Sequence, residues 1–230
     1  MLDLPAPVVR HVQVLRLQPG ARIRLFDGRA DTPWGLAEFE ATIVTMGRAS
    51  VRVQLGRALP ATGDPALQVT LAVGMPANDR MDWLIEKAAE LGAWAVQPLL
   101  TERSVLRLSG ERAVKKQAHW QAIAQAAAEQ SGACRVTVVQ PVRPLRDWLA
   151  DASAWAGAHR WVLALDSSPT GANGPAQATG PRVCLSGPEG GLSPAELQAA
   201  LDQGFVPWCL GPRVLRAETA PLVALARCLA

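Results

Sequence analysis

The chain has 230 residues, of which 49% are hydrophobic and 19% charged, so it can bury a core as one large or two small domains and is not a disordered chain. Its formal net charge is +3, which permits a nucleic-acid partner without requiring one. Most of the positive charge is arginine, whose planar fork suits phosphate, although the same bias also arises from GC-rich coding.

The sequence indicates neither a metal site nor a membrane segment. Its four cysteines have no Cys-x-x-Cys spacing and its three histidines are scattered, so we expect buried free thiols and no metal. It has no charged and apolar leader and no apolar run of about 18 residues. We therefore expect a cytoplasmic protein without membrane contact.

Residues 1–70 have the pattern of a small β unit, which we expect to form a barrel. One helix and three strands are expected, over residues 8–17, 22–26, 39–44 and 51–55. Arg22 and Arg24 alternate with apolar residues and so share one strand face, and Arg52 lies on a similar polar face. This surface is either an ordinary solvated face or a nucleic-acid contact.

Residues 71–230 form a second unit of alternating strands and helices, which begins with a strand at about residue 69. The expected strands cover 69–73, 94–100, 135–139, 161–165, 183–185 and 206–210, and the expected helices cover 79–91, 111–131, 144–149 and 194–203, with a last helix from about 219. This order predicts an α/β fold with a mainly parallel sheet covered on both faces. The low-complexity stretch 167–181 is expected to be a mobile surface loop.

Two Gly-Pro segments follow expected strands and lead into expected helices. The first, residues 186–192, has three glycines that let the backbone approach a ligand closely, and Ser193 with Glu196 then forms a helix-capping pattern. The second spans 210–219. Since the carboxyl ends of parallel strands meet at one edge of a sheet, the two segments can share one ligand. Taken alone, the first segment matches no known phosphate-binding motif and favours a plain tight turn.

Three longer motifs point to a known family. They are LSGPEGGL at residues 185–192, LGPRVLRAETA at 210–220 and MDWLIEKAAELG at 81–92. With these motifs, the chain resembles the ribosomal RNA small subunit methyltransferase E family over nearly its whole length. The shorter stretches 14–20, 25–28, 98–103 and 129–132 also fit the resemblance.

The resemblance implies a fold, a reaction and partners. It implies a SPOUT, or α/β-knot, enzyme with a PUA-like β-barrel that binds RNA over residues 1–70 and a trefoil-knot methyltransferase domain over 71–230. It also implies methylation of N3 of one uridine in the 16S rRNA of the small ribosomal subunit, with S-adenosylmethionine bound in the knot of a homodimer. Because the chain begins at Met1-Leu2-Asp3-Leu4, we expect it to lack the first barrel strand that the family usually has.

The resemblance also implies site residues. The loops after Leu100, after Leu185 and through 210–215 would hold the adenosyl group with backbone groups. The cofactor candidates are Leu100, Thr101, Leu185, Gly187, Gly190, Gly191, Leu210, Gly211, Leu215 and Thr219.

Catalysis and RNA contact are assigned to charged residues. Glu218 could accept the proton of uracil N3, and Arg216 could stabilise charge that develops on the uracil oxygens. The sequence alone favours the other interpretation of Glu218, a carboxylate in a first helical turn that the helix dipole stabilises. The phosphate-contact candidates are Arg16, Arg24 and Arg103; Arg103 also forms, with Glu102, either a second catalytic pair or a loop ion pair.

Two rival functions remain open. A SPOUT enzyme with another RNA target would share the cofactor loops but would not predict this N-terminal unit. A non-catalytic RNA-binding ribosome assembly factor that has lost turnover is kept open by the expected incomplete barrel, and the retained cofactor loops argue against it. A generic nucleotide-binding α/β protein is disfavoured because no phosphate-loop lysine follows the glycines.

Overall fold

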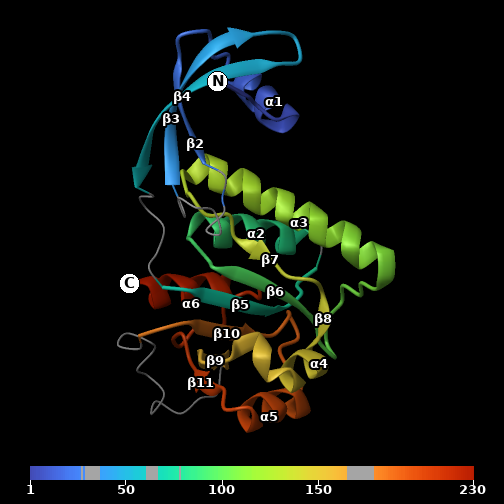
Figure 1. Ribbon diagram of the computed structural model, residues 1–230. Helices are drawn as coiled ribbons and strands as arrows, with labels where there is room; N and C mark the ends of the chain where they lie inside the picture. The colour runs from blue at the N-terminus through green and yellow to red at the C-terminus, as the bar shows by residue number, and fades with distance from the viewer. Residues whose placement is uncertain (27, 29–36, 61–66, 78, 165–178) are drawn as a thin grey trace. The chain divides into compact units, whose positions relative to one another are not determined.

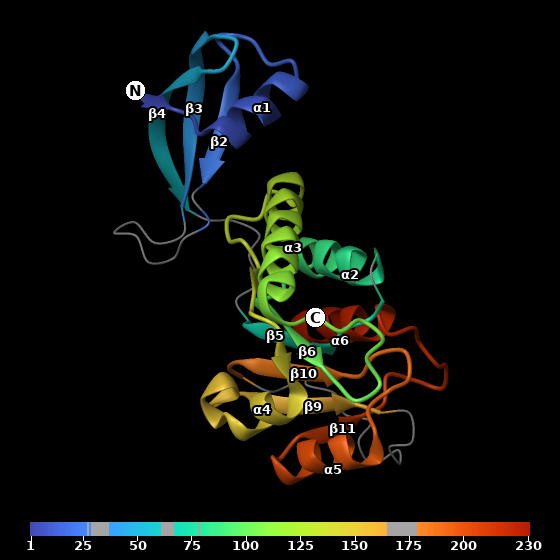
Figure 2. The same cartoon turned by 90° about the vertical axis from the view of Figure 1, so that its right-hand side faces the viewer.

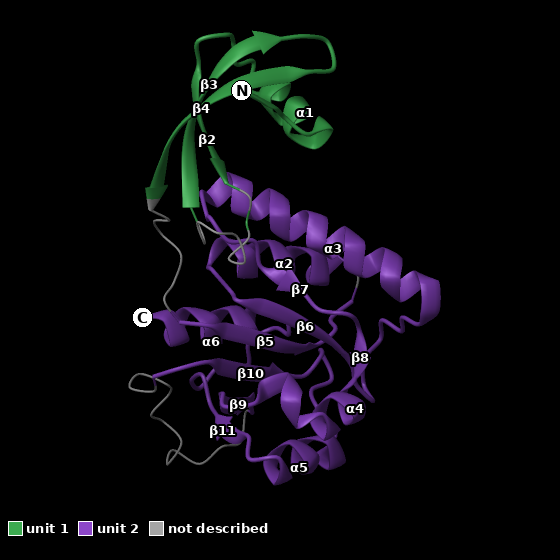
Figure 3. Ribbon diagram, in the orientation of Figure 1, with its two compact units in different colours: residues 1–64 green, residues 65–230 purple. Residues whose placement is uncertain are grey.

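The computed structural model of the protein describes residues 1–26, 28, 37–60, 67–77, 79–164 and 179–230 (Figure 1). The chain divides into two compact units, residues 1–64 and 65–230, which are coloured separately in Figure 3. The expected loop over 167–181 and the end of the expected strand 161–165 lie mostly outside the described residues. Within the described parts of the chain, we find no helix with the length and apolar character needed to cross a membrane.

Unit 1 is a four-stranded antiparallel sheet with one helix. Its elements are β1 (Leu2–Asp3), α1 (Ala6–Val14), β2 (Arg22–Phe26), β3 (Ala37–Met46) and β4 (Val51–Pro60), and the strand order is β1-β4-β3-β2. Val9 and Val12, three residues apart on α1, are buried against Ile43, Val51 and Val53 of the sheet. At the N-terminus, β1 is a two-residue strand in which Leu2 pairs with Val53 of β4. The expectation that the first barrel strand of the family is missing stays a prediction.

Unit 2 is an α/β unit built on a seven-stranded sheet. Its elements in chain order are β5 (Val69–Gly74), α2 (Asp79–Glu90), β6 (Ala95–Leu100), α3 (Gly110–Ser131), β7 (Val138–Val139), β8 (Arg143–Pro144), α4 (Leu145–Ala150), the 3₁₀ helix η1 (Ala152–Trp155), β9 (His159–Leu163), β10 (Arg182–Ser186), α5 (Pro194–Asp202), β11 (Val206–Trp208) and α6 (Thr219–Leu229).

The sheet of unit 2 has the order β11-β9-β10-β5-β6-β7, with β8 also paired to β6, and all of its described pairs are parallel. The prediction of a mainly parallel sheet is therefore confirmed. All five residues of β10 are buried, because it lies between β9 and β5 and is covered on both faces. A buried central strand explains why its middle residues, Val183 to Leu185, are continuously apolar instead of alternating.

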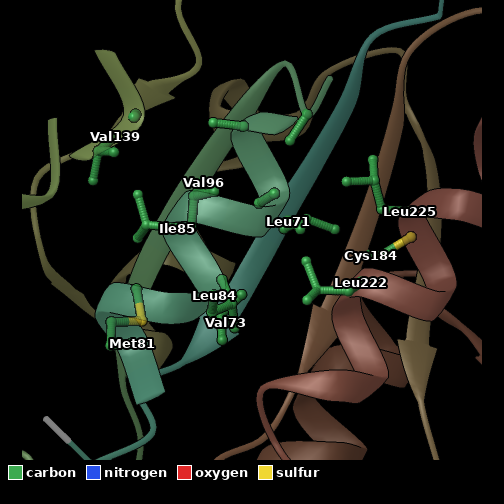
Figure 4. Packing of buried hydrophobic residues seen from close by; sticks show 14 of the residues in the cluster. Leu71, Val73, Met81, Leu84, Ile85, Val96, Val139, Cys184, Leu222 and Leu225 are labelled. Carbon is green, nitrogen blue, oxygen red and sulfur yellow. The ribbon is translucent and has the colours of Figure 1, made fainter. Parts of the chain in front are cut away.

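Two hydrophobic cores cover the two faces of this sheet. Alternate residues of β5 point to opposite sides: Leu71 and Val73 belong to the core formed with α2, α3 and α6, and Ala72 belongs to the core formed with α4 and α5. Figures 1 and 2 both show α2, α3 and α6 on one side and α4 and α5 on the other. Figure 4 shows Met81, Leu84 and Ile85 of α2, spaced by three and one residues, in the first of these cores.

One strand prediction was largely wrong. The expected strand over 135–139 is reduced to β7, which covers only Val138–Val139. In the preceding residues, side chains bond the neighbouring backbone: the Arg135 guanidinium donates to the carbonyls of Ala93 and Trp94, and the Thr137 hydroxyl donates to Ala93. At residues 135 and 137 the side chains thus bond to the backbone next to β6, and the backbone pairing begins only at Val138, whose amide donates to the Trp94 carbonyl at 3.3 Å.

Candidate active site

A cavity of about 440 Å³ lies at the carboxyl ends of β9, β10 and β11. Its walls include residues 163–164, 186–191 and 208–211, which follow or end these three neighbouring strands, and 213–217. The two Gly-Pro segments therefore do meet at one edge of a parallel sheet. This edge is where open α/β sheets bind their ligands, and the volume is that of a small-molecule site.

The glycine turn, residues 187–192, forms one wall, and close contacts or a positive φ disfavour side chains at its glycines. A Cβ atom on Gly187 would lie 2.6 Å from the amide nitrogen of Leu192. Gly191 has a φ of +67°, which side chains disfavour. Gly74, at the end of β5, packs so closely on Pro188 that a Cβ there would lie 2.6 Å from its Cδ. The turn is thus tightly folded against the sheet.

The glycine turn leads into α5 through a complete capping box. The Ser193 hydroxyl accepts from the amide of Glu196 at 3.3 Å, and Glu196 Oε2 accepts from the amide of Ser193 at 2.9 Å. Glu196 Oε1 also accepts from the amide of Glu102 at 2.7 Å. The start of α5 is therefore joined to the loop that follows β6.

Arg80 links two carboxylates beside the cavity. Its Nη1 lies 3.1 Å from Glu189 Oε1, and its Nε lies 3.9 Å from Glu218 Oε1. Burial opposes ionisation of Glu189, but hydrogen bonds from the amides of Ala77 and of Glu189 itself, together with Arg80, lower its pKa overall. Glu189 is thus held as an anion that fastens the glycine turn to the start of α2.

Glu218 is a buried carboxylate with incomplete hydrogen bonding. Its side chain is 10% exposed, and its Oε1 lies 4.0 Å from Arg216 Nη1. Its other oxygen, Oε2, is buried and has no hydrogen-bond partner among the described residues. Arg216 is 75% exposed and lines the cavity, so the pair combines one buried anion with one accessible cation.

Comparison with known proteins identifies the family. Residues 63–229 match the RNA methyltransferase domain family. The ribosomal RNA small subunit methyltransferase E of Synechocystis is 35% identical over 234 residues, covering 94% of this chain and 68% of the relative. The chain belongs to the ribosomal RNA small subunit methyltransferase E family. The resemblance drawn from the sequence motifs is therefore confirmed.

Two further members of the methyltransferase E family define how far the likeness extends. The Bacillus subtilis enzyme is 35% identical over 172 residues, which cover 69% of this chain and 64% of the relative. The match thus spans just under two thirds of that protein's length. The crystal structure of the Neisseria gonorrhoeae enzyme bound to S-adenosyl methionine has a TM-score of 0.86 and 32% identity, and covers 98% of this chain and 89% of that one.

The structure brings most residues expected from the family motifs to one cavity. The candidates that line it are Gly187, Gly190, Gly191, Leu210, Gly211, Leu215 and Arg216. Glu218 lies behind this wall, next to the lining residue Arg80. The remaining cofactor candidates, Leu100, Thr101, Leu185 and Thr219, lie outside the described wall; Leu185 is buried in the core beside α4 and α5.

The three phosphate-contact candidates are separated. Arg16 and Arg24 belong to unit 1, where Arg16 has a φ of +54° and Arg24 forms a 2.9 Å ion pair with the buried Glu38. Arg22 and Arg24 line a second hollow, of about 580 Å³, on the sheet of unit 1. Arg103 belongs to unit 2, where its guanidinium donates to the glycine turn.

Sequence reasoning missed four lining residues with informative side chains, namely Arg80, Glu189, Trp208 and Arg213. Glu189 and Arg213 lie within the two motifs and could have been proposed. Arg80 could not, because its role depends on α2 beginning beside a turn more than 100 residues later. Within the described residues, no group of three or more His, Cys, Asp or Glu side chains could hold a metal ion.

Proposed function

We propose that this protein is an S-adenosylmethionine-dependent methyltransferase that modifies N3 of a uridine in the 16S rRNA of the small ribosomal subunit. The observation that carries the proposal is the cavity itself, because two separate motifs of the methyltransferase E family, at residues 185–192 and 210–220, both line it. Family membership and the cofactor bound to the Neisseria gonorrhoeae relative support the same conclusion.

The residues around the cavity fit the cofactor. The glycine turn offers a backbone that a ligand can approach closely, and Leu163, Trp208, Leu210 and Leu215 provide apolar surface for an adenosyl group. Bound S-adenosylmethionine supplies an electrophilic methyl group. The candidates outside the wall, Leu100, Thr101, Leu185 and Thr219, would act mainly by supporting the residues that line it.

Two charged residues would serve the methyl acceptor. Uracil N3 carries a weakly acidic proton, and Glu218 Oε2, buried and without a described partner, is the acceptor that we assign to it. The Arg216 guanidinium, exposed at the cavity, would stabilise the negative charge that develops on the uracil oxygens. Arg80 lies near the other Glu218 oxygen and would keep the carboxylate oriented.

We also assign roles to the two parts of the chain. Residues 1–70 would form the PUA-like, RNA-binding part, which is consistent with the arginine-lined hollow on its sheet. Residues 71–230 would form the trefoil-knot domain of a homodimer. An rRNA substrate would place this activity in the cytoplasm.

Transfer of a labelled methyl group tests the activity directly. The full chain is incubated with methyl-labelled S-adenosylmethionine and small ribosomal subunits that lack their native methylations. We expect label in the 16S rRNA. Cofactor binding without transfer would instead favour the non-catalytic assembly factor.

A further inference from the structure

The loop after β6 is attached to the glycine turn by Arg103. Its Nη1 lies 2.8 Å from the carbonyl oxygen of Gly190 and 3.4 Å from that of Leu192. One guanidinium therefore approaches two carbonyl groups of the same turn, which limits how the turn can open. Hydrogen bonds from a charged donor are stronger than those between neutral groups.

The aliphatic part of Arg103 also packs on the turn. A Cβ atom added to Gly190 would lie 3.1 Å from Arg103 Cβ and 3.3 Å from its Cδ. These distances are shorter than ordinary van der Waals contact, so a methyl group at Gly190 would press on the arginine stem and displace it by a few tenths of an ångström. Arg103 thus contacts the turn with its stem and with its charged end.

The backbone that carries Arg103 is itself fixed. Thr101 Oγ1 and Ser104 Oγ lie 2.8 Å apart, and the Ser104 hydroxyl accepts from the amide of Thr101 at 3.1 Å. The amide of Glu102 donates to Glu196 at the start of α5. Arg103 therefore projects from an anchored loop, which lowers the entropic cost of holding its side chain in place.

From these contacts we propose that Arg103 is a positioning residue that keeps the glycine turn in its cofactor-binding shape. The sequence suggested an RNA phosphate contact for this arginine, and the structure gives its guanidinium two carbonyl partners in the turn instead. The inference rests on the proposed function, because it assumes that the turn binds S-adenosylmethionine. A preorganised turn would bind the cofactor more tightly than a turn that must be ordered on binding.

The test measures cofactor affinity and RNA affinity separately for variants of the full chain. Arg103→Ala should weaken S-adenosylmethionine binding about ten- to hundredfold, and Arg103→Lys should weaken it less, because a lysine can still donate to one carbonyl. Arg112→Ala is the matched control, since it removes an exposed arginine from the first turn of α3. Its cofactor affinity should stay within about twofold of the unmodified chain.

A double-substitution cycle tests the packing contact. Gly190→Ala should weaken cofactor binding in the unmodified chain, where the new methyl group meets the arginine stem. In the Arg103→Ala background the contacts with Cδ at 3.3 Å and Cγ at 3.7 Å are absent, whereas the contact with Cβ at 3.1 Å remains. The same substitution should therefore cost less there, and the loss in the double variant should be smaller than the product of the two single losses. Thermal midpoints are measured for all variants, including the conservative Arg103→Lys. A variant that loses cofactor affinity with an unchanged midpoint has kept its fold and lost only the shape of the turn.

A loss of RNA affinity without a loss of cofactor affinity would overturn the inference. If Arg103→Ala binds the cofactor like the unmodified chain but loses RNA affinity, with a salt slope reduced by about one, Arg103 is a phosphate contact and the inference is wrong. If the unmodified chain itself does not bind S-adenosylmethionine, the proposed function fails instead.

Discussion

Glu218 combines burial with an unused hydrogen-bonding position. Its Oε2 has no partner among the described residues, and leaving a buried acceptor unpaired costs about 1–3 kcal/mol. Two arginines, Arg80 and Arg216, stand about one ion-pair distance from the other oxygen. A chain keeps such a costly arrangement where a substrate completes it, which is the basis for assigning proton removal to this residue.

Replacing the two catalytic candidates should separate transfer from binding. We expect Glu218→Gln to lower the methyl-transfer rate about 10²- to 10⁴-fold, because the amide cannot take up the N3 proton. Arg216→Ala should also slow transfer, by loss of charge stabilisation. Both should bind S-adenosylmethionine within about twofold of the unmodified chain by calorimetry. Full turnover by Arg216→Ala would disprove the role given to that arginine.

At the scale of elements, the glycine turn depends on the absence of a side chain at its start. Gly187→Ala would bring a Cβ atom within 2.6 Å of the Leu192 amide nitrogen, so the turn must shift. We expect the cofactor dissociation constant to rise at least tenfold, on the order of 1.4 kcal/mol. The measurement is a cofactor titration of the variant.

Gly132→Ala provides the control for this prediction. Gly132 caps α3 with a φ of +75°, and a Cβ atom there would meet no atom within 4 Å. The substitution should lower stability by about 1 kcal/mol while cofactor affinity is retained. Equal losses of affinity in both variants would show that backbone strain, and not the shape of the turn, explains the effect.

Asp82 connects α2 to α3 through three hydrogen bonds. It accepts from Lys116 Nζ at 2.9 Å, His119 Nε2 at 2.9 Å and Trp120 Nε1 at 2.8 Å. Burial opposes ionisation of Asp82, but the hydrogen bonds from His119, Lys116 and Trp120 lower its pKa below the ordinary value of 3.8. The carboxylate is therefore more favoured in the folded than in the unfolded chain.

Asp82→Asn should destabilise the fold by about 1–2 kcal/mol at neutral pH, since an amide cannot satisfy three donors. Because the folded-state pKa is depressed, the stabilisation by Asp82 is complete above about pH 4 and is lost as pH falls through the folded pKa. Denaturant unfolding at several pH values measures the difference between variant and unmodified chain, which should shrink below about pH 4.

Asp202→Asn is the matched control, because Asp202 is an exposed helical aspartate that accepts one hydrogen bond, of 2.8 Å, from Gln198 Nε2. We expect it to change stability by less than about 0.5 kcal/mol. A pH-independent loss in Asp82→Asn would contradict the role given to the carboxylate charge.

The sequence predicted most elements where the local pattern was strong. The apolar run at β10 and the three- and four-residue spacing of Met81, Leu84 and Ile85 in α2 both gave the right element. The prediction failed at 135–139, where the side chains of Arg135 and Thr137 donate hydrogen bonds to backbone carbonyls more than 40 residues earlier in the sequence. No local pattern reports such contacts.

At the scale of the whole molecule, the sequence pattern did not predict the order in which the strands pair. The alternation of strands and helices predicted a parallel sheet, but β10 pairs with β5, more than 100 residues earlier. The same long-range pairing brings Arg80 to Glu189. That the two Gly-Pro segments share a site could be predicted from the sequence. Which charged residues complete that site depends on the full topology.

RNA binding should respond to salt, and cofactor binding should not. Because phosphate contacts release counterions, the logarithm of RNA affinity should fall linearly with the logarithm of salt concentration. Arg16→Ala should reduce this slope by about one if Arg16 contacts a phosphate. Arg227→Ala, which removes an exposed arginine from the last turn of α6, is the control and should leave the slope unchanged. Filter binding of RNA over a salt series measures the slope for each variant.

The identity of the methylated nucleoside tests the central claim most directly. The purified chain is incubated with S-adenosylmethionine and small ribosomal subunits that lack their native methylations, and the digested rRNA is analysed by mass spectrometry. We predict new 3-methyluridine, in an amount that Glu218→Gln strongly reduces. A different methylated nucleoside, or none from a chain that binds the cofactor, would contradict methylation of uridine N3.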